Sequence, residues 1–455
     1  MRLVCVEEGE VGAFVRLVSR LGCSCRVVCS GGVCRVYLEY VPSSLRVLKG
    51  FAAWIGYLLG RCRPVVPVPA ASLPGLPGLL GAVHVSDGGD VCFERVGGGS
   101  VCLPVDVFWS HMGVFGSTGS GKSTTTAYVV SRLASCGVVG VVFDWHGEYR
   151  GLLGAFGSGF YEYSYPGLPR LPLLPGGDVD AAVDVFSDVL GLSDNQALLM
   201  LDLLESIRSY CLTGELRGRL GILLQLGGGP PRALDDVCRG GEGSLRGFMR
   251  LVMELYNRLY VVESRGEKEA WAALLRRLRM ALREPGLFSL EAGSLEDVVQ
   301  LPSEGIVVFN LSRIRSGRSR ALYALLLARL LYEEAYRTNR LMNTVLVFEE
   351  AHNLNPRRGG MTGGVLSRLA EEARKYRLGI IVVDQSPGLL DKSLLANLNT
   401  VIMHRVHSSR DLEALKSVAP SSRELEKTLP TLRTGEAILA STALPAPVPI
   451  IIRAR

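Results

Sequence analysis

Lysine is scarce in this chain, and several features that would assign it to a familiar class are missing. Of the 50 basic residues among 455, only seven are lysine, so each lysine can be considered individually. The first ten residues carry acidic side chains where a secretory signal needs basic residues followed by an apolar stretch. No repeat recurs with a fixed period of about 20–50 residues, so a solenoid is not expected. No zinc-finger or RNA-binding signature is present either.

Long apolar runs are also missing. The best candidate for a membrane segment, Gly50–Gly60, has eleven residues, whereas a helix that spans a bilayer needs about 20. We expect a core helix at this position, with an interfacial helix as the alternative, so membrane association through residues 45–63 stays open. The sequence as a whole predicts a cytoplasmic protein.

The overall composition is that of a folded protein with a large core. The chain is 48% hydrophobic and 21% charged, which excludes a disordered protein. Its length corresponds to two or three domains, at about 150 residues for each domain. The net charge of +6 suits an acidic partner but does not identify one.

Cysteines are concentrated near the N-terminus, where eight of the 11 precede residue 103. Four of them, at positions 23, 25, 29 and 34, lie in a segment that predicts two strands joined by a Ser-Gly-Gly turn. Their spacing does not match the paired C-x2-4-C knuckles of zinc sites. Three interpretations stay open: buried apolar cysteines, a disulfide between Cys29 and Cys34 across the hairpin, and a metal site.

The chain divides into two predicted domains. Residues 1–106 predict a small β-rich domain with an apolar helix and a linker at 64–80, where the density of proline excludes helix interiors and central strands. Residues 107–455 predict an α/β domain in which helices cover both faces of a mostly parallel sheet, because apolar strands alternate with helices. Within it, residues 178–285 have helical periodicity and no convincing strand, which indicates a helical insertion. Strands are expected at 112–116, 138–144, 306–310, 344–348, 379–384 and 400–404, and helices at 124–133, 319–336 and 365–376.

The strongest motif is GSTGSGKS at residues 116–123, which matches the phosphate-binding pattern G-x4-G-K-[ST] between an expected strand and an expected helix. Glycines let backbone N–H groups turn toward phosphate oxygens, and the helix N-terminus adds partial positive charge. Lys122 can reach the β- and γ-phosphates of ATP, and the hydroxyl of Ser123 can bind Mg²⁺. The residues expected to bind the nucleotide are Gly116, Ser117, Thr118, Gly119, Ser120, Gly121, Lys122, Ser123 and Thr124.

Two consecutive carboxylates follow the expected strand at 344–348. Neighbouring side chains at a strand end point to different sides, so one can lie beside a metal ion while the other faces the attacking water. We expect Glu349 to hold Mg²⁺ through water and Glu350 to act as the general base. ATP and Mg²⁺ are therefore the expected cofactors.

Other strand ends carry further candidates. Gln385 is expected to contact the γ-phosphate or its water. Asp144 and Glu148 lie at the end of another strand, on the edge where open α/β sheets bind ligands, and Asp144 is expected to shape the metal environment. Arg405 follows the strand at 400–404. Arg374 closes a helix, where it is either a cation for the phosphoryl group of a neighbouring subunit or a cap of the helix C-terminus.

A run of arginines beyond the strand at 306–310 is the candidate DNA contact. Loops in such a position can line a channel and bind phosphates without reading the base sequence. A solvated basic turn is the alternative interpretation. The residues of this run are Arg313, Arg315, Arg318 and Arg320.

Together these motifs resemble the HerA branch of the HerA/FtsK superfamily of ring-forming DNA motors. The segments HMGVFGSTGSGKS, DWHGEY, FEEAHNLNP, RKYRLGIIVVDQSP and VIMHRV occur in this order within residues 107–445. The resemblance implies a RecA-like P-loop ATPase core and a hexamer with ATP at subunit interfaces and duplex DNA in a central channel. It further implies that Arg374 is the trans-acting finger, that Gln385 is the sensor, and that a NurA-like nuclease is a partner in processing DNA ends.

Two alternatives to this interpretation remain. The N-terminal β-barrel of the HerA branch is not clearly visible in residues 1–106, where a divergent barrel is one interpretation. The related VirB-type ATPases share the motor but use it for DNA transfer or uptake in a membrane complex, and the apolar segment Gly50–Gly60 would suit that branch. The alternative from another class is a nucleotide-dependent switch or scaffold. The intact Lys122, Ser123 and Glu350 disfavour it.

Overall fold

The computed structural model describes residues 2–7, 24–30, 33–40, 91–175, 177–216, 218, 232–239, 242–262, 265–284, 286–354, 363–419 and 422–453. In the first three ranges the description is limited to the backbone. The predicted helix at Gly50–Gly60 and the predicted linker at 64–80 lie outside the described residues.

The described N-terminal strands form a small antiparallel sheet. It consists of β1 (Arg2–Glu7), β2 (Ser24–Ser30) and β3 (Val33–Tyr40) in the order β1-β3-β2. The register places Cys29 opposite Cys34, as the hairpin interpretation predicts. The side chains of these cysteines are not among those described, so the three interpretations of the cysteines stay predictions.

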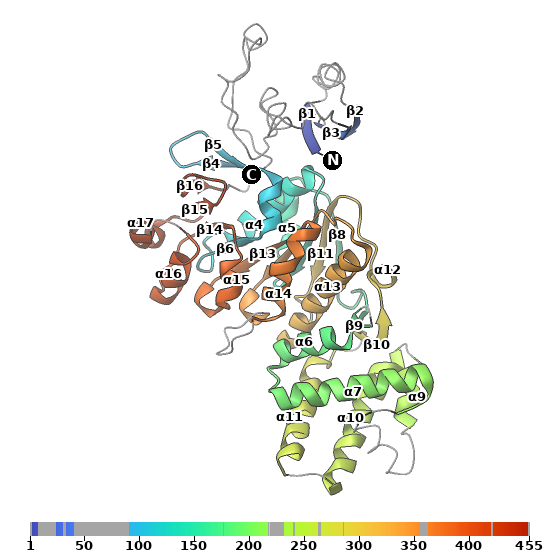
Figure 1. The fold of residues 1–455 in the computed structure, drawn as a ribbon. Coiled ribbons are helices and arrows are strands. Elements are labelled where there is room, and N and C mark those ends of the chain that lie inside the picture. The colour runs from blue at the N-terminus through green and yellow to red at the C-terminus, as the bar shows by residue number, and fades with distance from the viewer. Residues whose placement is uncertain are drawn as a thin grey trace.

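An 11-stranded, mostly parallel sheet dominates the rest of the described chain, with the order β5-β4-β16-β15-β14-β6-β13-β12-β7-β11-β8 (Figure 1). Its parallel centre contains all six strands expected from the sequence, each within one residue of the expected ends. They are β6 (Met112–Phe115), β7 (Val139–Asp144), β11 (Gly305–Asn310), β12 (Thr344–Glu349), β13 (Leu378–Asp384) and β14 (Thr400–Met403). The predicted fold class, a RecA-like P-loop ATPase core, is confirmed.

Of the outer strands, the sequence did not clearly predict β8, β15 or β16, whereas short strands at residues 82–107 were expected. The strand β8 (Phe160–Ser164) adds to β11 in parallel. On the other side, β15 (Glu436–Ser441), β16 (Val448–Ile451), β4 (Val91–Arg95) and β5 (Ser100–Leu103) continue the sheet as antiparallel strands. Because β4 pairs with β16, this sheet begins before the domain boundary that we placed at residue 107. A disulfide, Cys92–Cys102, joins β4 to β5.

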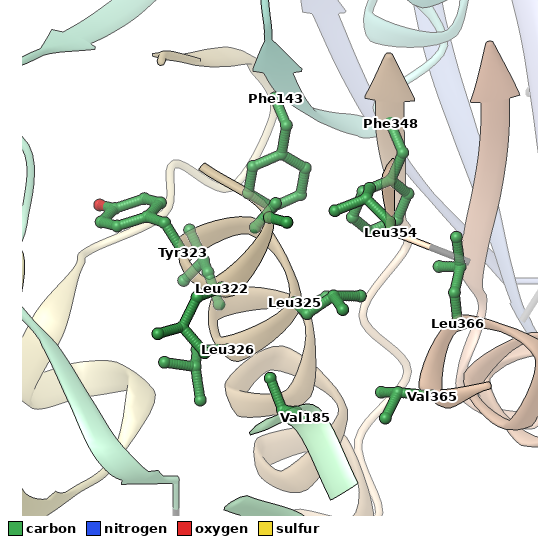
Figure 2. Close-up of a cluster of buried hydrophobic side chains, with 14 of the residues drawn as sticks. Phe143, Val185, Leu322, Tyr323, Leu325, Leu326, Phe348, Leu354, Val365 and Leu366 are labelled. Carbon is green, nitrogen blue, oxygen red and sulfur yellow. The ribbon is translucent and has the colours of Figure 1, made fainter. Parts of the chain in front are cut away.

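Alternate residues of the central strands face two separate cores. Val345 and Val347 of β12 pack in the cluster that contains α4 (Lys122–Ser135) and α5 (Tyr149–Ala155). Leu346 and Phe348 face the other cluster, which contains α13 (Gly317–Thr338) and α14 (Val365–Glu372). In this second core Phe143 and Phe348 stack at 4.9 Å between ring centroids, and Figure 2 shows Leu322 and Leu325 of α13 reaching toward them. Burial on both faces explains why these strands read as continuous apolar runs.

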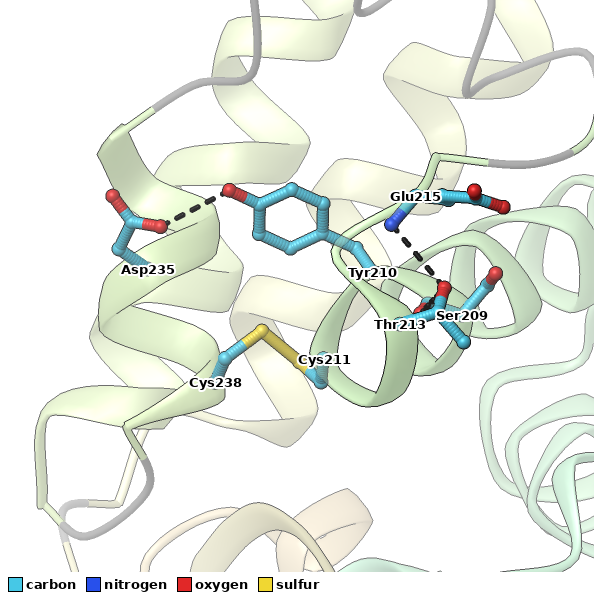
Figure 3. Close-up of a disulfide and its surroundings, with 7 residues drawn as sticks. All are labelled: Ser209, Tyr210, Cys211, Thr213, Glu215, Asp235 and Cys238. Carbon is cyan, nitrogen blue, oxygen red and sulfur yellow. Dashed lines mark hydrogen bonds between the residues drawn. A yellow bond between two sulfur atoms is a disulfide. The ribbon is translucent and has the colours of Figure 1, made fainter.

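The helical insertion is a lobe on one side of the sheet (Figure 1). Its described part contains helices and turns and no strand. The helices are α6 (Val179–Leu190), α7 (Asp194–Thr213), α9 (Arg232–Cys238), α10 (Glu242–Val262) and α11 (Arg265–Ala281). A disulfide between Cys211 and Cys238 ties the end of α7 to the end of α9 (Figure 3).

Short elements connect these parts. A two-stranded parallel sheet of β9 (Leu171–Pro175) and β10 (Phe288–Gly293) flanks the insertion at both of its ends in sequence. The remaining elements are η2 (Val105–Ser110), α12 (Leu295–Val298), η3 (Ala351–Asn353), η4 (Ala373–Tyr376), η5 (Pro387–Leu389), α15 (Lys392–Ala396), α16 (Ser409–Lys416), α17 (Ser422–Thr428) and η6 (Leu429–Thr431). None of the helices in the described part of the chain combines the length and the apolarity needed to cross a bilayer.

His111 links three elements of the domain from a buried position. Its Nδ1 accepts the N–H of Ile380 in β13 at 3.0 Å, and its Nε2 donates to the carbonyl of Ala370 in α14. Burial lowers the pKa of His111 to about 4. Burial likewise lowers the pKa of His404 to about 4. Both histidines are therefore neutral in the folded protein at neutral pH.

We expect stability to fall in acid because of these two histidines. Below pH 6.5 the unfolded chain takes up protons that the folded chain accepts only near pH 4. The contribution of the two neutral histidines to stability is therefore fully present above pH 6.5 and is lost as the pH falls toward 4. Each histidine can contribute about 3 kcal/mol to this loss. Calorimetric melting temperatures should fall less steeply with acid in His111→Gln than in the wild type. The exposed His407→Gln should keep the wild-type slope, and an unchanged slope in His111→Gln would contradict the assignment.

Candidate active site

The loop between β6 and α4 has the backbone of a phosphate-binding loop. Gly121, immediately before α4, has a left-handed φ of 111°, which side chains rarely adopt. At Gly116 a Cβ atom would lie 2.6 Å from the Cβ of His404, so only glycine fits there. These two positions explain two of the three glycines in the motif. The expected strand before the loop and the expected helix after it are both present.

Two other segments hold this loop from outside. The N–H of Ser117 donates to the carbonyl of Arg405 at 2.8 Å, and the N–H of Gly435 donates to the carbonyl of Ser120 at 3.0 Å. Beneath the loop, the buried His404 contacts Thr125 Oγ1 through Nε2 at 2.8 Å. The loop is therefore shaped before any ligand arrives.

Lys122 faces a concentration of negative charge. Burial lowers the pKa of its ammonium, while the nearby carboxylates of Glu350, Asp384, Glu349 and Glu148 oppose this shift. Its Nζ donates to the carbonyl of Ser117 at 3.2 Å. Residues from three separate parts of the sequence thus meet at Lys122.

Glu349 is a buried carboxylate, with 3% of the residue exposed. Burial, followed by the charge of Asp144, raises the pKa of Glu349 to about 8. Two hydrogen bonds act in the opposite direction: the N–H of Trp145 donates to Oε2 at 3.1 Å, and the hydroxyl of Ser123 also binds the carboxylate. A carboxylate held beside a hydroxyl is an all-oxygen set of the kind that Mg²⁺ prefers. A cation at this position would offset the cost of the buried negative charge, so Ser123 and Glu349 fit a magnesium site.

Glu350 has hydrogen-bonding neighbours that differ from those of Glu349. Its φ of 49° is left-handed, which is uncommon for a residue other than glycine. Its Oε1 lies 3.4 Å from His146 Nε2, and its Oε2 lies 3.4 Å from Gln385 Nε2 and 3.5 Å from His352 Nδ1. The carboxylate is thus surrounded by hydrogen-bonding groups at long distances while it keeps access to solvent.

Gln385 connects the phosphate loop to Glu350. Its Oε1 accepts the hydroxyl of Thr118 at 2.9 Å, and its Nε2 is the amide that approaches Glu350. A side chain in contact with both groups can respond to a γ-phosphate placed between them.

Asp144 organises the turn that follows β7. Its Oδ1 accepts the N–H groups of His146, Gly147 and Glu148, the shortest at 2.7 Å, and its Oδ2 accepts the N–H of Tyr149 at 3.1 Å. Because both oxygens bind backbone, Asp144 would influence a metal ion only through its charge near Glu349 and through the shape of this turn. Glu148, in the same turn, is exposed and faces Lys122.

The sequence analysis missed the roles of His146, His352 and Asp384 at this end of the strands. His352 binds Asp384 Oδ2 through both its backbone N–H at 2.7 Å and its Nδ1 at 2.9 Å, and this hydrogen bond raises the pKa of His352. His146 approaches Glu350 from the other side. The segments DWHGEY and FEEAHNLNP contain both histidines, and histidine beside a strand-end acid is the signal that could have identified them.

The two candidate cations lie at opposite ends of the parallel strands, Arg405 after β14 and Arg374 before β13. Arg405 follows β14 beside the phosphate loop, and its Nε is buried without a hydrogen-bond partner in the described structure. Arg374 is exposed in η4, before the start of β13. The length of β13 separates Arg374 from the Gln385 edge by roughly 20 Å, so Arg374 cannot reach the phosphates of its own chain.

Arg320 does not fit its predicted role as a DNA contact. Its guanidinium donates to the carbonyls of Ile314 at 2.7 Å, Ser312 at 2.8 Å and Trp145 at 3.1 Å, and it lies 5.5 Å from the centroid of the Trp145 ring. The donors of this guanidinium are therefore used within the chain, in holding the loop 311–316. The exposed Arg313 and Arg315 and the half-buried Arg318 keep that expectation as a prediction.

Comparison with known proteins shows similarity to the HerA helicases. Residues 95–170 match the family model described as "Helicase HerA, central domain". The DNA double-strand break repair helicase HerA of Sulfolobus acidocaldarius is 26% identical over 81% of this chain and 70% of its own length, and that of Sulfurisphaera tokodaii is 23% identical over 76% and 65%. The chain thus spans about two thirds of the length of these relatives.

Solved structures show the same fold. VirB4 of Thermoanaerobacter pseudethanolicus superposes with a TM-score of 0.56 at 16% identity, over 80% of this chain and 96% of that one. The bacterial conjugative coupling protein TrwB superposes with a TM-score of 0.54 at 15% identity, over 80% and 89%. The sheet and the phosphate loop are those of a RecA-like P-loop ATPase. Within that class, the resemblance to the HerA branch of the HerA/FtsK superfamily is confirmed.

The position of Arg320 predicts a structural effect of its removal. We expect Arg320→Ala to lower the free energy of unfolding by about 3 kcal/mol, because three backbone carbonyls in partly buried hydrogen bonds lose a charged donor. Arg320→Lys should recover little of this loss, since an ammonium lacks the planar fork of the guanidinium. Urea unfolding measures both changes. The exposed Arg313→Ala should remain near the wild type, and equal stability of all three variants would show that Arg320 does not hold the loop.

Proposed function

We propose that this chain is an ATP-driven DNA translocase or helicase of the HerA kind, which works on duplex DNA in end processing or repair. The observation that carries the proposal is the convergence of Lys122, Ser123, Glu349, Glu350 and Gln385 at one edge of the sheet. The names of the HerA relatives support DNA as the partner.

The nucleotide would occupy the phosphate loop. The backbone N–H groups of residues 116–123 and the N-terminus of α4 would bind its phosphates, and Lys122 would turn from the carbonyl of Ser117 to the β- and γ-phosphates. Ser123 and Glu349 would hold Mg²⁺, which would neutralise charge on the phosphates. The plasmid coupling protein TrwB, which has a similar fold, forms a complex with ADP and Mg²⁺.

Glu350 is the general base of the proposal. Its carboxylate would accept a proton from the water that attacks the γ-phosphate. Its left-handed backbone turns it away from the buried Glu349, so one acid can serve the metal and the other the water. Gln385, which lies between Thr118 and Glu350, would sense the γ-phosphate and report its loss.

The assembly in this proposal is a ring, most simply a hexamer, with ATP at the subunit interfaces. An exposed Arg374, remote from its own phosphate loop, suits a finger that acts on the neighbouring subunit. A NurA-like nuclease would be the partner in end processing. The alternative role is that of a VirB-type motor for DNA transfer or uptake across a membrane, which the fold shared with VirB4 and TrwB would also allow.

The function is tested by ATP hydrolysis of the purified protein with and without linear duplex DNA. We expect DNA to stimulate hydrolysis, and we expect Glu350→Gln to lower turnover by a factor of about 100 or more while ATP still binds, because the amide cannot accept the proton. The exposed Glu371→Gln is the matched control. Binding of ATP without turnover in the wild type would instead support the switch or scaffold, and turnover that survives in Glu350→Gln would remove this residue from its role.

The role of Arg374 is tested by mixing subunits. We expect Arg374→Ala alone to lose hydrolysis, and a mixture with Glu350→Gln subunits to recover part of it, because an intact base and an intact finger can then meet at one interface. Arg340→Ala, at the same edge of the sheet, should hydrolyse ATP normally. Loss of activity without recovery on mixing would favour a structural role for Arg374.

A further inference from the structure

An arginine-lined pocket lies between the helical insertion and the catalytic edge. Its volume is about 740 Å³, and it is open to solvent. Arg279 and Arg283, at the end of α11 and just after it, line one wall, and Arg315 and Arg318, around the start of α13, line another. The insertion and the arginine run, separate features of the sequence, thus contribute to one site.

The positive charge of this pocket is not neutralised within the part of the chain that the structure describes. None of the four guanidinium groups forms an ion pair there with a carboxylate. Arg279 Nη2 contacts Met253 Sδ, and Arg318 Nη1 contacts Met280 Sδ at 3.3 Å. The nearby carboxylate of Glu284 accepts the backbone N–H of Arg315 at 3.2 Å. Like charges around one cavity repel, so the arrangement favours an anion.

The start of α13 adds to this preference. Gly317 and the capping residue Ser316 line the pocket, and the helix that begins there has 22 residues. Its N-terminus contributes partial positive charge on the same side as the arginines. None of the described lining residues is Phe, Tyr or Trp, so the base of a free nucleotide would find no ring to stack on. A sugar–phosphate backbone fits this chemistry better.

The opposite end of the pocket leads to the catalytic acid. His352 and Asn353 line the pocket, and both follow Glu350 in the turn after β12. The ring of His352 lies 2.9 Å from Asp384 and 3.5 Å from Glu350 Oε2. One side chain therefore borders the pocket and contacts the network around the general base.

We propose that the pocket binds a phosphate of the DNA backbone and that its occupancy controls hydrolysis by Glu350 through His352. This inference rests on the proposed function. A phosphate among the arginines attracts the imidazole of His352 and the amide of Asn353, and so changes the contacts of His352 with Asp384 and Glu350. DNA would then be sensed directly behind the general base, with His352 as a positioning residue.

The binding half is tested with a fluorescently labelled linear duplex. Arg279→Ala/Arg283→Ala should weaken its binding about tenfold and reduce the slope of log affinity against log salt by about 2, because two phosphate contacts are lost. Hydrolysis without DNA should persist in this variant, since both side chains lie away from the catalytic edge. Arg276→Ala, on the exposed side of α11, is the matched control. Unchanged affinity and salt slope in the double variant would overturn the inference.

The coupling half is tested on His352. His352→Ala should bind the duplex as the wild type does but lose stimulation of kcat, and His352→Asn, whose amide can still reach Asp384, should recover part of it. Full stimulation in His352→Ala would overturn the coupling. Absence of hydrolysis in the wild type, with and without DNA, would refute the proposed function, and the binding measurements would still test the pocket.

Discussion

The parallel register of β6, β13, β12 and β7 is the constraint on which the site depends. Parallel strands point in one direction, so the segments that follow them meet at one edge of the sheet. The hydrogen bond between Thr118 and Gln385 joins residues 267 positions apart in the chain. The apolar cores on the two faces hold the strands in this register, and the polar groups collect where the strands end.

At that end of the strands, groups of opposite charge lie close together and partly offset the cost of burying one another. Burial opposes the ionised forms of Lys122 and Glu349, and the cluster of carboxylates around Lys122 partly offsets the cost to its ammonium. Hydrogen bonds from backbone N–H groups satisfy Asp144 and Asp384. Such an arrangement would suit a cation and phosphate, and electrostatic catalysis of phosphoryl transfer requires groups placed in advance in this way.

The arginines show why residue type alone does not define a role. Arg315, Arg318 and Arg320 are neighbours in one basic run, yet Arg320 turns inward to three backbone carbonyls while Arg315 and Arg318 line an open pocket. The other two arginines of that pocket, Arg279 and Arg283, lie at the end of α11 and just after it, in the helical insertion. The insertion is thereby connected to the catalytic edge through Arg279 and Arg283 on one side and His352 on the other.

The sequence by itself determined the parallel core, because strands buried on both faces are continuous apolar runs. It also located the phosphate loop, the two acids at the end of β12 and Gln385, because each of them lies where such a strand ends. It did not predict β8, β15 or β16 clearly: β8, at one edge of the sheet, mixes polar with apolar residues, and β16 is only four residues long and contains a proline. Only the tertiary structure decided the role of Arg320, the network of His352 with Asp384 and Glu350, and the four-arginine pocket. These features join residues distant in sequence, and their contacts depend on how the insertion and the sheet pack together.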